Sequence, residues 1–121
     1  MNSDLNQNKV DKPWGYYITL YEADTYKVKL LFIEKGHSIS LQKHYMRAEQ
    51  WTIIKGNPLI TKGPLISAYS PKCNISIEKE EEHRIAATID DVLILELQLG
   101  NCEETDIVRL EDKYNRLIDG L

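Results

Sequence analysis

Three side chains that can bind a metal ion lie between Gly36 and Gly56: Gln42, His44 and Glu49. They offer an amide oxygen, an imidazole nitrogen and a carboxylate oxygen, a set that suits Zn²⁺, Mn²⁺, Fe²⁺ or Co²⁺. Gln42 and His44 are two residues apart, so on an extended strand both side chains point to the same face. The stretch therefore predicts a metal site on one face of a β-sheet, built without a thiolate ligand.

Short strands separated by turns have to position these residues. The segment 50–55, QWTIIK, is rich in aromatic and β-branched residues and predicts the strand that follows Glu49. Many short strands of this kind indicate an all-β barrel or sandwich. The other predicted strands are 17–21, 26–34, 74–78, 83–88 and 92–99, with a hairpin over 58–70 that is broken at Gly63-Pro64.

The two ends of the chain do not show the strand pattern of the middle. Residues 1–11 are polar and are expected to form a tail, so that a single domain covers 12–121. A helical spacing of apolar residues predicts a short C-terminal helix at about 105–119, with Thr105 or Asp106 as its N-cap. The apolar positions of this helix are Ile107, Leu110, Tyr114, Leu117 and Ile118.

Composition excludes several classes of function. The 121 residues include 19 acidic and 15 basic side chains, and a net charge of −4 argues against a nucleic-acid partner. The sequence contains no run of 18 apolar residues and no apolar leader near its start, so no membrane segment is expected. Cys73 and Cys102 form no C-x-x-C pair, and we expect a reduced, cytoplasmic protein.

The spacing around the three ligands resembles the first cupin motif, which runs glycine, five residues, His-x-His, three or four residues, glutamate, six residues, glycine. Here Gln42 takes the place of the first histidine. More specifically, the chain is similar to the cupin domain of type II mannose-6-phosphate isomerases, which often follows a mannose-1-phosphate guanylyltransferase in bifunctional enzymes. The matching segments are KPWGYY at 12–17, YKVK at 26–29, SLQ-x-H-x-x-RAE-x-W at 40–51, HR at 83–84, E-x-Q-x-G at 96–100 and DIVRLED-x-Y-x-R at 106–116.

This resemblance implies a fold and a metal set. The fold would be an all-β cupin, a double-stranded β-helix or jelly-roll barrel, with the short C-terminal helix added. The ligands would be Gln42, His44 and Glu49 together with His83, the histidine at the position of the second cupin motif. They would hold one divalent ion, with zinc expected first and manganese, cobalt or iron as alternatives.

The resemblance also implies the interconversion of mannose 6-phosphate and fructose 6-phosphate, which feeds GDP-mannose and polysaccharide synthesis. A base must move a proton between C2 and C1 of the sugar, and the sequence leaves Glu49 and Glu96 as candidates. Glu96 and Gln98 interrupt an apolar strand. Buried polar groups need partners, so both are expected to face an inward polar pocket where Gln98 contacts substrate.

Four cationic residues are candidates for the phosphate: Arg47, Arg84, Arg109 and Lys29. Each has an alternative role. Arg47 is two residues from Glu49 and would serve equally well to orient that ligand. Arg84 neighbours His83 on a strand and should therefore point to the opposite face. Arg109 would also suit the end of the barrel or a dimer contact.

Several positions depart from the family pattern. Tyr45-Met46 replaces a histidine-rich run, Gln50 replaces a histidine, and the acidic loop 78–82 precedes His83 where the family has a proline and a glycine. An acidic loop at the pocket mouth would repel a phosphosugar. Two alternatives therefore stay open: a cupin that binds or acts on another sugar phosphate or nucleotide sugar, and an inactive cupin used for binding or assembly. A homodimer is expected by analogy with other cupins.

Overall fold

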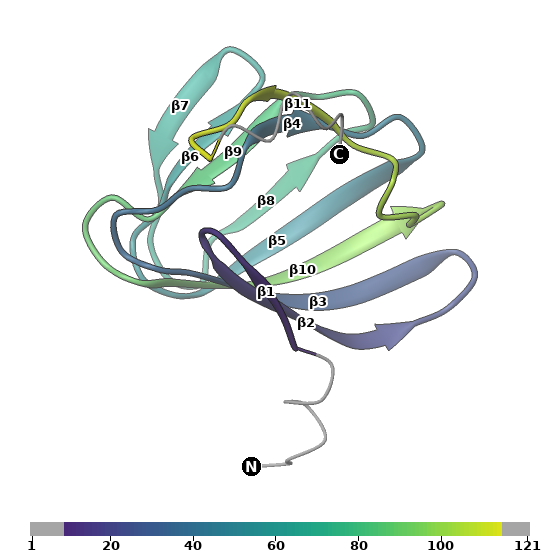
Figure 1. Ribbon diagram of the computed structural model, residues 1–121, viewed down its shortest axis with the longest axis horizontal. Helices are drawn as coiled ribbons and strands as arrows, with labels where there is room; N and C mark the ends of the chain where they lie inside the picture. Colours follow the sequence, from purple (N-terminus) through teal and green to yellow (C-terminus); the bar gives the residue numbers. More distant parts are fainter. Residues whose placement is uncertain (1–8, 115–121) are drawn as a thin grey trace.

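The computed structural model describes residues 9–114, and this range consists of eleven strands and the loops between them (Figure 1). The first sheet has the order β1 (Lys9–Lys12), β2 (Gly15–Glu22), β3 (Tyr26–Ile33), β10 (Val92–Gly100), β5 (Arg47–Lys55) and β8 (Asn74–Ile77). The second has the order β11 (Val108–Glu111), β4 (Leu41–Lys43), β9 (His83–Ala86), β6 (Leu59–Lys62) and β7 (Leu65–Ala68). The two sheets face each other across one interior.

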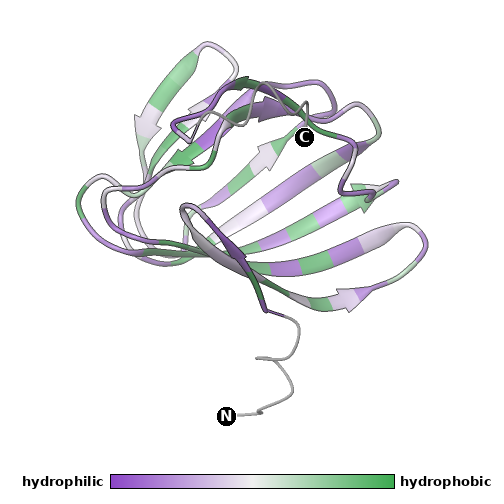
Figure 2. Cartoon of the chain, in the orientation of Figure 1, coloured by the Kyte–Doolittle hydropathy of each residue, from purple (hydrophilic) through white to green (hydrophobic). Residues whose placement is uncertain are grey.

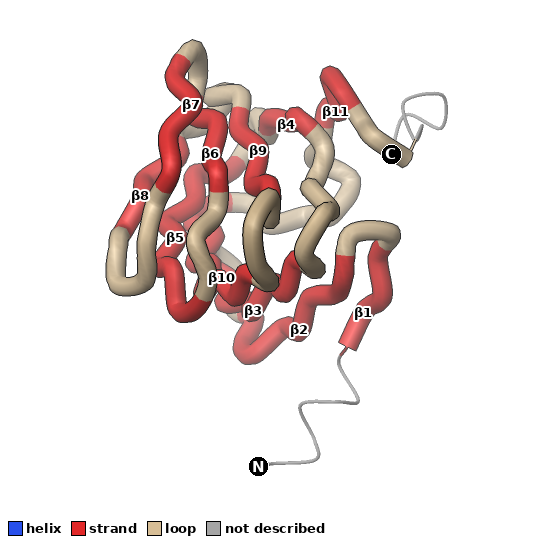
Figure 3. The backbone as a smooth tube through the Cα atoms, turned by 90° about the vertical axis from the view of Figure 1, so that its left-hand side faces the viewer, coloured by secondary structure: helices blue, strands red, loops and turns tan. Residues whose placement is uncertain are grey.

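The strand pairs that enclose this interior are antiparallel throughout. Strand β10 lies between β3 and β5, and β9 lies between β4 and β6. Figure 3 shows only strands and loops over residues 9–114, and no described helix could cross a membrane. The predicted all-β cupin architecture is therefore confirmed, as is the hairpin broken at Gly63-Pro64, where β6 pairs with β7.

Apolar side chains fill one half of the interior. Along the central strands every second residue is buried, as the period of two in a β-strand requires. Buried isoleucines from both sheets meet there, including Ile33 and Ile94 from the first sheet and Ile85 from the second. The rest of this cluster is Trp14, Leu31, Ile39, Trp51, Ile53, Ile60, Ile75, Ile77, Ala87 and Val92.

The other half of the interior is polar, because buried polar residues replace buried apolar ones toward one end of each of the three central strands. Figure 2 shows the hydropathy along these strands. In the register of the sheet, Glu96 lies opposite Lys29, and Gln98 lies opposite both Lys27 and Glu49. Antiparallel pairing thus brings the polar start of two strands beside the polar end of the third. On these three strands the buried polar residues are Lys27 and Lys29 of β3, Arg47 and Glu49 of β5, and Glu96 and Gln98 of β10.

The N-terminal segment differs from the predicted polar tail. Residues 9–11, at the end of that tail, belong to β1, where Val10 pairs with Tyr17 and Lys12 pairs with Gly15. The polar composition of β1 is compatible with a strand because this strand lies at the edge of its sheet, and most of its side chains are exposed. Residues 1–8 lie outside the described range.

The predicted C-terminal helix is wrong over its described part, 105–114, where Val108–Glu111 forms β11 instead. Strand β11 pairs with β4 and covers the edge of the second sheet, and this tertiary pairing outweighs the helical spacing of the apolar residues. Asp106 is not a helix cap: its carboxylate accepts hydrogen bonds from the N–H groups of Tyr45 and Met46, at 2.9 and 2.8 Å. Residues 115–119 of the predicted helix lie outside the described range.

Gly36 and Gly56, the two glycines of the motif, have similar φ angles, 87° and 90°, but different surroundings. A Cβ at Gly56 would lie 2.2 Å from the carbonyl oxygen of Asp91, whereas nothing lies within 4 Å of one at Gly36. We expect Gly36→Ala to lower the free energy of unfolding by about 1–2 kcal/mol, from the left-handed backbone alone. Gly56→Ala should lower the free energy of unfolding by at least about 2 kcal/mol more, because the backbone at Asp91 must also move. Urea unfolding of both variants tests this, and equal losses would contradict it.

Candidate metal centre

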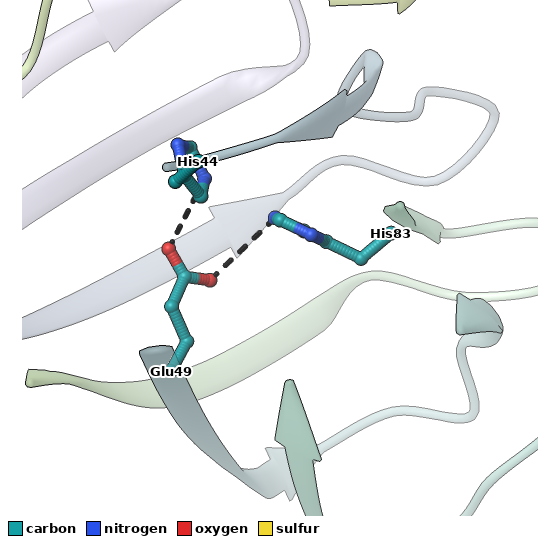
Figure 4. Close-up of side chains that lie close together, drawn as sticks. All are labelled: His44, Glu49 and His83. Atoms are coloured by element: carbon teal, nitrogen blue, oxygen red, sulfur yellow. Dashed lines mark ion pairs between the residues drawn. The ribbon is translucent and has the colours of Figure 1, made fainter. Parts of the chain in front are cut away.

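His44, Glu49 and His83 converge in the polar half of the interior (Figure 4). His44 follows β4, Glu49 lies on β5 and His83 begins β9, so both sheets contribute. The candidate ligand atoms lie within 4.8 Å of one another. Oε2 of Glu49 is 3.3 Å from Nε2 of His44, and Oε1 is 3.7 Å from Nε2 of His83. All three residues are almost completely buried, with exposures of 2%, 1% and 0% in chain order.

Backbone carbonyl groups determine which nitrogen of each imidazole faces Glu49. Nδ1 of His44 lies 2.6 Å from the carbonyl oxygen of Asp106, and Nδ1 of His83 lies 2.8 Å from that of Glu81. Because a carbonyl oxygen only accepts, each Nδ1 carries the proton, and in the neutral ring Nε2 keeps a lone pair. A metal-binding histidine usually donates a hydrogen bond in this way from the ring nitrogen that does not bind the metal.

The charges in this group are set by burial and by one permanent cation. Burial lowers the pKa of His44 to about 4, with Arg47 acting in the same direction and Glu49 against it, so His44 is neutral near pH 7. Burial alone would raise the pKa of Glu49, but His83, His44 and Arg47 together lower it. Glu49 is therefore a carboxylate, and Arg47 is its permanent counter-charge.

These residues fit a divalent metal ion. In the described structure Nε2 of His83 is buried and has no hydrogen-bond partner. This nitrogen lies 3.7 Å from a carboxylate oxygen of Glu49, so a divalent cation between the two atoms would bind both and would satisfy the buried nitrogen. Two imidazole nitrogens and one carboxylate oxygen leave coordination positions open, as catalytic sites require.

Gln42, the fourth predicted ligand, lies beside this group. Its Nε2 is 3.4 Å from Nε2 of His44. Its Oε1 accepts a hydrogen bond of 2.7 Å from the hydroxyl of Ser40, so the amide oxygen is directed away from His44. The role of Gln42 as an oxygen ligand stays a prediction.

A cavity of about 290 Å³ adjoins the candidate metal centre. Gln42 and Arg47 line the cavity and also contact His44, so they connect the two sites. Most of the predicted substrate-binding residues also lie here. The lining consists of Lys12, Trp14, Tyr17, Lys29, Leu31, Ile39, Gln42, Arg47, Glu96, Gln98, Glu104, Thr105, Ile107 and Arg109.

The two candidate bases, Glu49 and Glu96, have different surroundings. Glu49 accepts hydrogen bonds from Nε1 of Trp51 at 3.0 Å and from Nε of Arg47 at 2.9 Å, and it does not line the cavity. Glu96 lines the cavity and accepts a hydrogen bond of 2.7 Å from Nε2 of Gln98. Burial, reinforced by the charge of Glu49, raises the pKa of Glu96. Of the two carboxyl groups, Glu96 is therefore the one in reach of a substrate.

Arg84 lies away from this cavity. Its Nη1 is 3.1 Å from a carboxylate oxygen of Glu111, and its Nε donates to the carbonyl oxygen of Ile39 at 3.3 Å. Alternation along β9 turns Arg84 away from the side that His83 faces, as the sequence predicts. The geometry gives no support to Arg84 as a phosphate ligand in this cavity.

The acidic loop 78–82 supports the histidines through its backbone. The N–H of Glu80 donates to the carbonyl oxygen of His44 at 2.7 Å, and the carbonyl of Glu81 holds His83. No residue of this loop lines the cavity, and the repulsion of a phosphosugar at the pocket mouth stays a prediction.

A cluster that the sequence did not predict joins Lys27 and Lys29 to Glu104. One carboxylate oxygen of Glu104 lies 3.0 Å from Nζ of Lys27 and 2.6 Å from Nζ of Lys29. Nζ of Lys29 also lies 4.0 Å from the centre of the Tyr17 ring. The predicted phosphate ligand Lys29 thus lines the cavity, with its charge already balanced by a carboxylate.

Glu104→Gln should lower the free energy of unfolding by about 1–3 kcal/mol, because two buried ammonium groups lose a shared counter-charge. The range is below that of a fully buried pair because the side chain of Glu104 is 48% exposed. Glu103→Gln is the matched control, since the hydrogen bonds of Glu103 to Arg47 and Asn101 use backbone atoms. Equal urea unfolding curves for the two variants would contradict this role of Glu104.

The fold and the site together define a cupin, a double-stranded β-helix protein. The cupin-2 domain Rru_A2000 from Rhodospirillum rubrum superposes with a TM-score of 0.64 at 21% identity, covering 88% of this chain and 78% of that one. CapF from Staphylococcus aureus, a capsular polysaccharide assembling protein, gives 0.73 at 15% identity, covering 85% of this chain and 34% of that one. At these identities the similarity concerns the fold.

Residues 2–112 match the family described as mannose-6-phosphate isomerase C-terminal, and the chain belongs to this family, as the sequence predicted. It is 33% identical over 110 residues to xanthan biosynthesis protein XanB of Xanthomonas campestris pv. campestris, covering 89% of this chain and 24% of XanB. It is 31% identical over 111 residues to mannose-1-phosphate guanylyltransferase of Escherichia coli strain K12, covering 90% and 23%. The chain thus spans about a quarter of the length of these curated relatives.

Proposed function

We propose that this chain is a metal-dependent isomerase that interconverts mannose 6-phosphate and fructose 6-phosphate. One observation carries the proposal: a His–Glu–His metal centre adjoins a cavity whose wall holds a carboxyl group and several cations. Membership of the mannose-6-phosphate isomerase C-terminal family supports the choice of substrate.

The reaction moves a proton between C2 and C1 of the sugar, and negative charge develops on the sugar oxygens. A divalent ion held by His44, Glu49 and His83 would supply Lewis-acid stabilisation of that charge. Glu96 is the proposed base, because it faces the cavity while Glu49 is held by Trp51 and Arg47. Gln98 orients Glu96 by donating a hydrogen bond to its carboxyl group.

The charge of the cavity wall favours a phosphorylated ligand. Four cationic residues, Lys12, Lys29, Arg47 and Arg109, line it, against two acidic ones, Glu96 and Glu104. Of these four, Arg47 and Arg109 are the proposed phosphate ligands. Their planar guanidinium groups match two phosphate oxygens at once.

The names of the relatives support a place in polysaccharide synthesis. They include XanB, alginate biosynthesis protein AlgA of Pseudomonas aeruginosa, and several mannose-1-phosphate guanylyltransferases. An isomerase of this kind would feed GDP-mannose synthesis by supplying mannose 6-phosphate. The cytoplasmic location and the homodimer stay predictions.

A coupled assay on mannose 6-phosphate tests the function directly. The protein is stripped of metal with a chelator and reloaded in parallel with Zn²⁺, Mn²⁺ or Co²⁺. Turnover that appears only after reloading would support the isomerase and indicate the metal. Stoichiometric metal binding without turnover would contradict the isomerase and favour another sugar substrate. A folded protein that binds no metal would contradict the site itself.

A further inference from the structure

Arg47 is hydrogen-bonded to two of the three candidate metal ligands. Its Nε donates to Oε2 of Glu49 at 2.9 Å, and its Nη2 lies 3.2 Å from Nε2 of His44. Since Nδ1 of His44 carries the ring proton, Nε2 is an acceptor, and the guanidinium is the donor in this contact. Arg47 is 6% exposed, so these bonds are formed out of water.

We propose that Arg47 is an internal cation that competes with the metal ion for His44 and Glu49, and that it turns into the cavity when the ion binds. This inference rests on the proposed metal centre. The Nε2 atom of neutral His44 has one lone pair, which cannot serve a guanidinium N–H and a metal ion together. Two cations at this distance in a buried site also repel each other strongly.

The structure offers Arg47 a place in the cavity. Arg47 lines the cavity of about 290 Å³, and its further hydrogen bond, from Nη1 to the carbonyl oxygen of Glu103, is long, at 3.4 Å. Released from Glu49 and His44, the guanidinium could offer its N–H groups to an anion in the cavity. Metal binding and anion binding would then strengthen each other, and such a coupling is reciprocal.

A purely orienting role for Arg47 makes the opposite prediction. If Arg47 holds Glu49 in place for the ion, then its removal weakens metal binding. Glu49 has a second anchor, however, because Nε1 of Trp51 donates to Oε1 at 3.0 Å from within the core. Glu49 therefore keeps one fixed carboxylate oxygen without Arg47. The main effect of removing Arg47 is then the loss of its competition with the metal ion.

The experiment is a titration of chelator-stripped protein with Co²⁺, followed by visible absorption. Arg47→Met should bind Co²⁺ about tenfold or more tightly than wild type, since a bond from a charged donor no longer has to be broken. Arg84→Met is the matched control, an arginine paired with Glu111 away from the site, and its affinity should equal that of wild type. Equal or weaker binding by a folded Arg47→Met would overturn the proposal.

Arg47→Lys keeps a positive charge beside Glu49 and serves if the methionine variant does not fold. The single ammonium group of lysine cannot contact both Glu49 and His44 as the planar guanidinium does. The Arg47→Lys protein should therefore also bind Co²⁺ more tightly than wild type. Sulfate, as a phosphate-like anion at constant ionic strength, should raise the Co²⁺ affinity of wild type but not of Arg47→Met. A wild-type affinity that does not respond to sulfate would overturn the movement into the cavity.

The outcomes separate this inference from the proposed function. If neither wild type nor the folded variants bind Co²⁺, the metal centre fails and the isomerase proposal fails with it. If wild type binds Co²⁺ and the Arg47 variants bind it no more tightly, only the competition by Arg47 is refuted.

Discussion

Replacement of His44 with alanine is expected to weaken metal binding more than 100-fold and to abolish isomerase turnover. The binding free energy of a site with three or four protein ligands is roughly 10–16 kcal/mol, so one ligand contributes on the order of 3 kcal/mol, which exceeds a factor of 100. Loss of the ring also leaves Glu49 with one neighbour fewer in a fully buried site. Titration with Zn²⁺ against a chromophoric chelator and the coupled assay measure the two effects.

His37 provides the matched control for His44. It is one of three histidines in the chain, and its Nδ1 lies 2.6 Å from the hydroxyl of Tyr114, away from the metal centre. His37→Ala should leave both metal affinity and turnover near wild type. A His44→Ala protein that keeps stoichiometric metal and full turnover would refute the site, as would equal losses in the two variants.

Glu96→Gln should lower turnover by about 100- to 10,000-fold while metal affinity changes little. This is the usual contribution of a positioned acid–base group, and glutamine keeps the shape of the side chain but accepts no proton. Glu96 lines the cavity but is not one of the three candidate ligands that converge on the ion. Steady-state kinetics and the Zn²⁺ titration, on the same protein preparation, separate a loss of chemistry from a loss of metal.

Glu82→Gln is the control for this variant, because Glu82 is exposed on the loop before His83 and does not line the cavity. Turnover near wild type in Glu96→Gln would remove it as the base. A parallel loss of metal and turnover in Glu96→Gln would instead make Glu96 part of the metal centre.

Local patterns in the sequence predicted the residues that lie near one another along the chain. His44 and Glu49 are five residues apart, and the spacing of the motif predicted that they lie close together, whereas the ligand role of Gln42 stays a prediction. Glu96 and Gln98 were recognised because polar residues interrupt an apolar strand, and both are buried beside the cavity. The short strands were also predicted from a local pattern, the alternation of apolar and polar residues.

Long-range contacts were not predictable from such patterns. Glu104 is 75 residues from Lys29, and nothing near either residue indicates that the loop after β10 folds back over β3. His83 was assigned only through the family resemblance, since a single histidine after an acidic loop has no local signature. The predicted C-terminal helix failed for a related reason: the free edge of β4, which β11 covers, is a property of the assembled sheet.

Asp106 makes the metal centre depend on the order in which the protein is built. Its carbonyl group holds Nδ1 of His44, and its carboxylate closes the turn at Tyr45 and Met46, although it lies 62 residues further along the chain. During synthesis the first sheet can pair as soon as β10 has left the ribosome, whereas His44 has its final support only when Asp106 has followed. A metal centre that includes His44 would therefore be complete only after the chain has been made as far as Asp106, which is later than the pairing of the first sheet requires.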